Sequence, residues 1–181
     1  MAIEFGATAW GRDWVRLAQP TSATRPNPAL PRARTLARND KVRAAHLAPG
    51  SITATVDDRT DRDVALTFPT WTEAQQAIAT DTLAGRSAGE DLPDELHRAL
   101  TEAGVPPTPG AGSLSVACSC GKPSCAHFLA VLFEVARRLD ERPASALALR
   151  GVTELDTAQP AARIPITRID PATFYGATAA N

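Results

Sequence analysis

Ten residues, Cys118-Ser-Cys120-Gly-Lys-Pro-Ser-Cys125-Ala-His127, contain all three cysteines of the 181-residue chain and one of its three histidines. Three thiols and an imidazole at C-x-C-x4-C-x-H spacing make a complete Cys3His set for a tetrahedral zinc ion. Four protein ligands fill the usual coordination of zinc and leave no position for water or a substrate. The segment therefore predicts a structural zinc site with Cys118, Cys120, Cys125 and His127 as its ligands.

Two elements of different type must bring these ligands together. The alternation of residues 114–117 predicts a strand, and side chains two residues apart on a strand share a face, so Cys118 and Cys120 can reach one ion. Residues 121–124 have the composition of a turn. Apolar residues at helical spacing from 128 to 139 predict a helix beginning near residue 124, whose positive end favours a thiolate at Cys125. The unit should be a strand, a knuckle and a helix.

Two other uses of the thiols are weaker. A disulfide would leave one of three cysteines unpaired, and nothing in the sequence indicates secretion. A nucleophilic pair of cysteine and histidine would need a third, orienting group, and none is visible nearby. Because the chain also lacks a glycine-rich phosphate loop or a convincing catalytic constellation, we expect neither an enzyme nor a small-molecule substrate.

At these four ligands the chain resembles the SWIM zinc-finger family, whose signature is C-x-C-x(n)-C-x-H. The opening segment 5–14, with its Trp-Gly-Arg core, and the arginine-rich segment 34–38 are similar to those of small stand-alone bacterial members, as is the segment 143–151. The short spacer lacks the aromatic residue of many members, and the chain after Thr153 has no counterpart. The resemblance implies a module that binds DNA or proteins, found in chromatin-remodelling helicases, transposases and recombination-associated proteins, without catalysis.

Charge is unevenly distributed although the net charge is only −1. Residues 1–50 carry eight basic and three acidic side chains, whereas residues 51–104 carry four basic and eleven acidic ones. A basic run is often just a solvated face. The alternative is a set of contacts to nucleic-acid phosphates. The residues predicted to make such contacts are Arg32, Arg34, Arg38, Lys41 and Arg43, with Lys122 from the finger.

The remaining pattern predicts an α+β fold, a small antiparallel sheet with helices, joined to the strand-knuckle-helix finger. We expect helices at 8–18, 70–84 and 93–103, and strands at 42–47, 52–56 and 64–68, with a linker at 19–31 and a charged turn at 57–63. A capping box at Thr70–Glu73 should open the second helix, with Trp71, Ala74, Ile78 and Leu83 inward. His46 and His97 are interpreted as structural.

Three regions are expected: an N-terminal α+β region at 1–104, the finger and following helices at 113–151, and an extended tail rich in Pro, Ala and Thr at 152–181. No long apolar run or signal sequence is visible, so a cytoplasmic protein without membrane contact is expected. Two functions remain open. One is binding of DNA or RNA, with zinc holding the knuckle. The other is an adaptor role, in which the finger and its apolar helix dock on a helicase or recombination factor.

Overall fold

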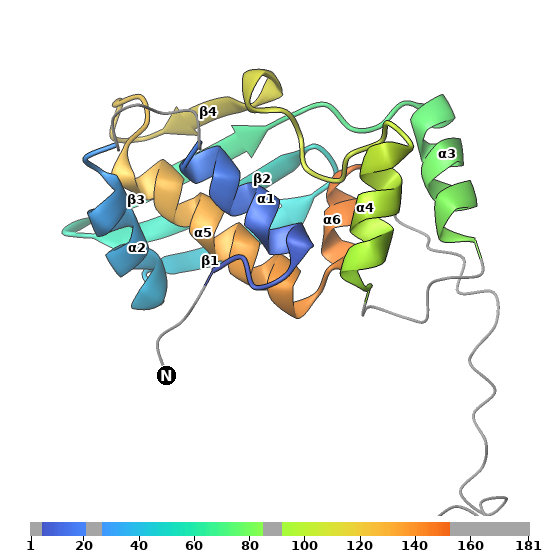
Figure 1. The fold of residues 1–181 in the computed structure, drawn as a ribbon. Coiled ribbons are helices and arrows are strands. Elements are labelled where there is room, and N and C mark those ends of the chain that lie inside the picture. Colours follow the sequence, from blue (N-terminus) through green and yellow to red (C-terminus); the bar gives the residue numbers. More distant parts are fainter. Residues whose placement is uncertain (1–4, 21–26, 85–91, 153–181) are drawn as a thin grey trace, which may run out of the picture.

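The computed structural model describes residues 5–20, 27–84 and 92–152, which form an α+β fold (Figure 1). A four-stranded antiparallel sheet has the order β1-β2-β3-β4. Helices α1, α2 and α5 lie against one face of the sheet, while α3 and α4 stand at one end. The other face carries small residues such as Thr53, Ala65 and Ala117 and is not covered by a helix of the described ranges. The predicted fold class is confirmed.

The sheet is an antiparallel meander in which a long connection separates β3 from β4. β1 (Val42–Ala48), β2 (Ser51–Asp58) and β3 (Thr60–Thr67) follow one another, and β4 (Ser115–Cys118) joins β3 only after α3, α4 and the short 3-10 helix η1 (Ala111–Ser113). The charged segment 57–63 was predicted as a turn, but the strands pair through it and Arg59, at φ +52°, makes the tight turn. Pairs of opposite strand residues therefore extend to Asp58 and Thr60.

Helix α5 (Ala126–Glu141) is the centre of the core. Its apolar face is buried between the sheet and the flanking helices α1 (Ala9–Ala18) and α2 (Leu30–Arg38). α2 lies in the region expected to be linker and basic run, where Pro31 occupies the first helical turn, a position that tolerates proline. Its buried side chains recur at helical spacing: Leu30, Ala33, Leu36 and Ala37. Of the basic run, Arg32 and Arg38 lie on the exposed side of this packed helix, whereas Lys41 and Arg43 follow it.

The N-terminal segment is fixed by the far end of α5. The carboxylate of Asp140 accepts hydrogen bonds from the backbone N–H groups of Gly6, Ala7 and Thr8, and from the Thr8 hydroxyl at 2.7 Å. Thr8 is the N-cap of α1, as predicted. At Gly11 the two helices cross so closely that a Cβ would lie 2.3 Å from Asp140 Oδ1. In the Trp-Gly-Arg segment, Gly11 and the fully buried Trp10 and Trp14 therefore serve packing, whereas Arg12 is exposed.

Helix α4 (Asp94–Glu102) lies where the sequence predicts it, whereas α3 (Glu73–Leu83) departs from the expectation in detail. The capping box is formed by Thr72 and Gln75, two residues later than predicted, because the chain enters the helix there in extended conformation. Trp71 and Leu83 are buried as predicted, but Ala74 and Ile78 are exposed, and α3 buries Ala79 instead. α3 packs mainly on α4, so it needs only a narrow apolar stripe.

The described parts of residues 1–104 and 113–151 share one sheet and one hydrophobic core. β4 pairs with β3, and α5 contacts β1, β2 and β3. α6 (Ala144–Leu149) closes the core beside β1. The predicted tail lies outside the described residues beyond Val152, as do residues 85–91. Within the described ranges, no helix combines the length and apolar character needed to cross a membrane.

Candidate metal centre

The structure gathers the four predicted ligands at one point between β4 and α5. Cys118 ends β4, Cys120 follows in the turn, Cys125 is the N-cap of α5 and His127 lies in its first turn. One ligand atom from each residue can be chosen so that all four lie within 4.8 Å of one another. The arrangement of strand, turn and helix agrees with the sequence prediction, and the group could hold a metal ion.

The donor set fits zinc. Tetrahedral coordination with Zn–S near 2.3 Å and Zn–N near 2.0 Å requires ligand atoms about 3.5–3.8 Å apart. Cys118 Sγ and His127 Nδ1 are already 3.7 Å apart. The widest separation allowed within the group, 4.8 Å, exceeds the tetrahedral value by about 1 Å, which a rotation of a cysteine side chain spans. All three cysteines are free thiols, so no disulfide competes for the sulfur atoms.

The backbone between the ligands adopts the conformations that its sequence favours. Gly121 has φ +67°, and its N–H donates to the Cys118 carbonyl at 2.9 Å, which closes the turn that carries Cys120. Ser124, at φ +50°, then reverses the chain into α5. At the start of α5 the Phe128 N–H donates to Cys125 Sγ at 3.4 Å, so the sulfur replaces the oxygen of an ordinary N-cap.

The thiols differ in acidity without a metal. Burial raises the pKa of Cys118 to about 12. Burial also opposes ionisation of Cys120, but the backbone N–H of Lys122 and the neighbouring ligand side chains lower its pKa to about 6. Only thiolates bind zinc, so a metal entering at neutral pH must displace a proton from Cys118.

A carboxylate and a guanidinium stand behind the histidine. Asp58, the last residue of β2, has its Oδ2 atom 3.0 Å from His127 Nε2. Arg32 on α2 binds the same carboxylate with two donors, Nε at 3.2 Å and Nη2 at 2.5 Å. Arg32 and His127 hold the pKa of Asp58 below its usual value, against the effect of burial. Asp58 is not among the site residues predicted from the sequence, although it continues the inward alternation of Ile52, Ala54 and Val56.

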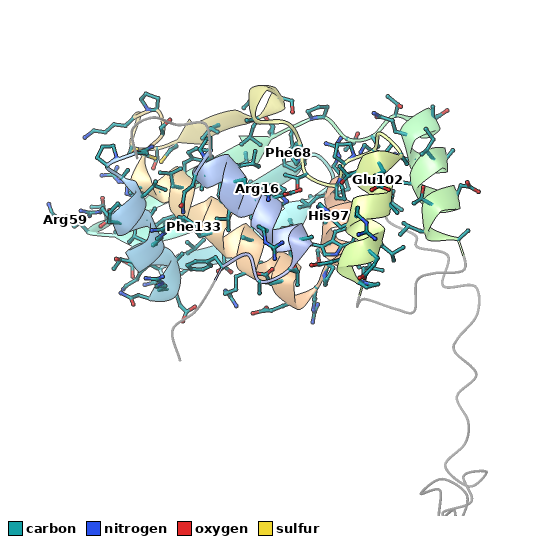
Figure 2. All side chains as sticks on the ribbon, viewed as in Figure 1. Arg16, Arg59, Phe68, His97, Glu102 and Phe133 are labelled. Carbon is teal, nitrogen blue, oxygen red and sulfur yellow. The ribbon has the colours of Figure 1, made fainter. Side chains whose placement is uncertain are left out.

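An open groove of about 670 Å³ lies beside the ligands. Four cationic side chains line it, from α2 (Arg32), the β2–β3 hairpin (Arg59 and Arg62) and the turn between the cysteines (Lys122). Figure 2 shows Arg59 projecting from this end of the sheet. Asp58 is the one acidic residue among the described residues that line the groove. The groove thus concentrates positive charge next to the candidate metal.

The six residues predicted to contact nucleic acid do not form one surface. Arg32 and Lys122 line the groove. Arg34 turns inward, where it donates to Gln19 and lies over the Phe133 ring, which Figure 2 labels. Lys41 and Arg43 both pair with Asp57. Arg38 is exposed at the opposite end of α2.

Arg59 and Arg62 are not among the predicted contacts, because the sequence predicts a charged turn at 57–63. The alternation of Arg62 with the buried residues Val64 and Leu66 was the available signal, because it places Arg62 on the helix-covered face of the sheet. His97 is buried, forms a T-shaped ring contact with Trp10, and lies 3.0 Å from Asp13, as suits the structural role predicted for it.

Comparison with protein-family models, curated proteins and solved structures found no match to this chain. The resemblance to SWIM fingers therefore rests on the ligand spacing and on the strand-turn-helix geometry. What the fold and site define is an α+β protein with a Cys3His group that could hold a metal ion.

Proposed function

We propose that this protein is a non-catalytic nucleic-acid-binding module in which a structural zinc ion, held by Cys118, Cys120, Cys125 and His127, maintains a phosphate-binding groove. The observation that carries the proposal is the groove itself. It brings Arg32 and Lys122, which are distant in sequence, together with Arg59 and Arg62 at the edge of the ligand cluster. The chemistry of zinc here is structural, because the four ligands complete its coordination.

The charge of the site favours binding of a polyanion even when a bound zinc ion is included. A zinc ion with three thiolates and one neutral histidine carries a formal charge of −1, and Asp58 adds another. The four cationic side chains of the groove outweigh both. Arg32, whose side chain is half exposed, keeps donors beyond the two that Asp58 engages. Phosphate oxygens are the natural acceptors for such donors.

The resemblance to SWIM fingers favours DNA over RNA as the ligand. In the adaptor hypothesis the apolar helix behind His127 is the docking surface. In the structure the apolar face of α5 is instead buried in the core, including Val131, Leu132 and Val135. We therefore place the nucleic-acid hypothesis first, and a protein partner such as a helicase or recombination factor remains the alternative.

A salt titration tests the proposal. The zinc-loaded protein is titrated onto labelled single- and double-stranded 20-mers of DNA and RNA by fluorescence anisotropy, from 25 to 200 mM NaCl. If all four groove cations contact phosphates, log Kd should rise with log[NaCl] with a slope of about 2.8–3.6, from about 0.7–0.9 per contact. No binding of any of these oligonucleotides at 25 mM NaCl by a protein with one bound zinc would overturn the nucleic-acid proposal.

A matched pair of triple variants locates the contacts. Replacing Arg59, Arg62 and Lys122 by Gln should lower the slope by about 2–2.7. The same loss of charge at the exposed residues Arg12, Arg16 and Arg98, on α1 and α4, should leave the slope within about 0.5 of the wild type, because long-range attraction alone is screened within about 10 Å at 0.1 M salt. Equal effects of the two variants would place the binding surface elsewhere.

A further inference from the structure

Asp58 connects the metal ligands to the cationic groove. Its Oδ2 atom lies 3.0 Å from His127 Nε2 and 3.2 Å from Arg32 Nε, and its Oδ1 atom lies 2.5 Å from Arg32 Nη2. The carboxylate is nearly enclosed: the Asp58 and His127 side chains are each 13% exposed, against 51% for Arg32. One carboxylate therefore contacts a ligand on its inner side and a groove cation on its outer side.

The orientation of the His127 imidazole determines which nitrogen faces the metal ligands and which faces Asp58. His127 Nδ1 lies 3.7 Å from Cys118 Sγ and so faces the thiols, whereas Nε2 faces Asp58. A neutral imidazole binds a metal through its unprotonated nitrogen and keeps a proton on the other. A carboxylate at Nε2 accepts that proton in a hydrogen bond, fixes the tautomer that frees Nδ1, and strengthens Nδ1 as a donor to the metal.

We propose that Asp58 is a positioning residue for the metal ligand His127, and that Arg32 contributes to metal affinity by holding Asp58 in place. The inference rests on the metal occupancy included in the proposed function, and it is independent of nucleic-acid binding. It assigns Arg32 two roles, one in the groove and one behind the metal. Metal and groove are then coupled through a single carboxylate.

The neighbouring carboxylate provides a control. Asp57 precedes Asp58 on the same strand and binds two cations, Lys41 at 2.9 Å and Arg43. Its side chain lies on the opposite face of the sheet, so it contacts no metal ligand. Asp57→Asn and Asp58→Asn therefore remove the same charge from adjacent positions, and only Asp58→Asn removes an acceptor from His127.

The test is zinc affinity of the full chain, measured at pH 7.5 by competition with a chromogenic chelator. Asp58→Asn should weaken zinc binding about 10–100-fold, the usual loss when a partner behind a ligand is removed. Arg32→Gln, which changes an exposed side chain, should weaken it by a smaller factor of about 3–10. Asp57→Asn, and Arg59→Gln in the groove, should stay within about twofold of the wild type, because exposed charges contribute little.

A second readout follows the histidine ring in the zinc-loaded protein by nitrogen-15 NMR. The wild type should show a slowly exchanging Nε2 proton on His127, and Asp58→Asn should make that proton exchange faster with water. Zinc affinities of Asp58→Asn and Arg32→Gln within twofold of a zinc-binding wild type would overturn the inference, as would an equal loss in Asp57→Asn. A wild type that binds no zinc would instead overturn the metal proposal itself. Arg32→Gln keeps the test decisive if Asp58→Asn fails to fold.

Discussion

The crossing of α1 and α5 at Gly11 gives a prediction whose sign opposes the usual rule. Gly→Ala within a helix normally stabilises a protein by about 0.5–1 kcal/mol, because alanine loses less conformational entropy on folding. Here the added Cβ would lie 2.3 Å from Asp140 Oδ1 and 2.6 Å from the Ala136 carbonyl oxygen, closer than real Cβ atoms approach a neighbour. The two helices must therefore separate, or Asp140 must move.

The magnitude follows from the contacts at stake. Inserting a methyl group into a filled core costs about 1–3 kcal/mol. Moving Asp140 also weakens its hydrogen bonds to Gly6, Ala7 and Thr8, and one lost bond to a charged group costs about 1.5–3 kcal/mol. After subtracting the gain in helix propensity, we expect Gly11→Ala to lower the free energy of unfolding by roughly 2–4 kcal/mol.

Urea denaturation followed by circular dichroism measures this change. The control is Gly112→Ala, where no atom lies within 4 Å of the added Cβ, and its effect should be within about 0.5 kcal/mol of zero. Both variants should retain the m-value of the wild type, because neither changes the surface exposed on unfolding. A Gly11→Ala protein as stable as the wild type, or more stable, would refute the close packing of α1 on α5.

Three further predictions concern the metal, pH and α3. Cys125→Ser should abolish stoichiometric zinc and lower the midpoint of the single unfolding transition, because α5 lies in the shared core; a separate transition for the N-terminal region would contradict this. Burial opposes ionisation of Asp13, but His97 lowers its pKa below 3.8. The ionised Asp13 therefore stabilises the fold above pH 4, and this contribution is lost as the pH falls through the lowered pKa. In thermal melts, Asp13→Asn should reduce the fall in melting temperature at acid pH. Thr72→Ala should cost about 1 kcal/mol by removing the cap bonded to Gln75, and Thr72→Ser should restore most of it.

The metal centre was accessible to sequence analysis because its chemistry is local. Cys118 to His127 span ten residues, and the strand before them and the helix after them have clear periodicity. The site behind the ligands was not accessible in the same way. Asp58 and Arg32 reach His127 only through pairing in the sheet and the packing of α2, and neither contact is encoded by spacing along the chain.

Two errors of interpretation have the same physical origin. The many charged residues of the segment 57–63 favour a turn in the sequence-based prediction, although the segment also alternates like a strand. Strand pairing tolerates charged residues at the end of a sheet. The prolines before and within α2 favour a linker in the sequence-based prediction. Pro31, however, lies in the first helical turn, where a helix needs no N–H donor. In both cases tertiary contacts outweighed local composition: pairing of β2 with β3 in the first, and packing of α2 on α5 in the second. The groove is lined by residues of these two elements, α2 and the β2–β3 hairpin, so it could not be predicted without them.

The position of β4 late in the sequence has a consequence for folding during synthesis. On the ribosome, the meander of β1, β2 and β3 has emerged before the segment that contains the thiols, and only α5 completes the layer that covers it. We therefore expect nascent chains that end before residue 115 to expose the apolar side of an unfinished sheet and to need a chaperone. Pulse proteolysis of stalled chains of increasing length should show protection appearing abruptly once α5 has left the exit tunnel.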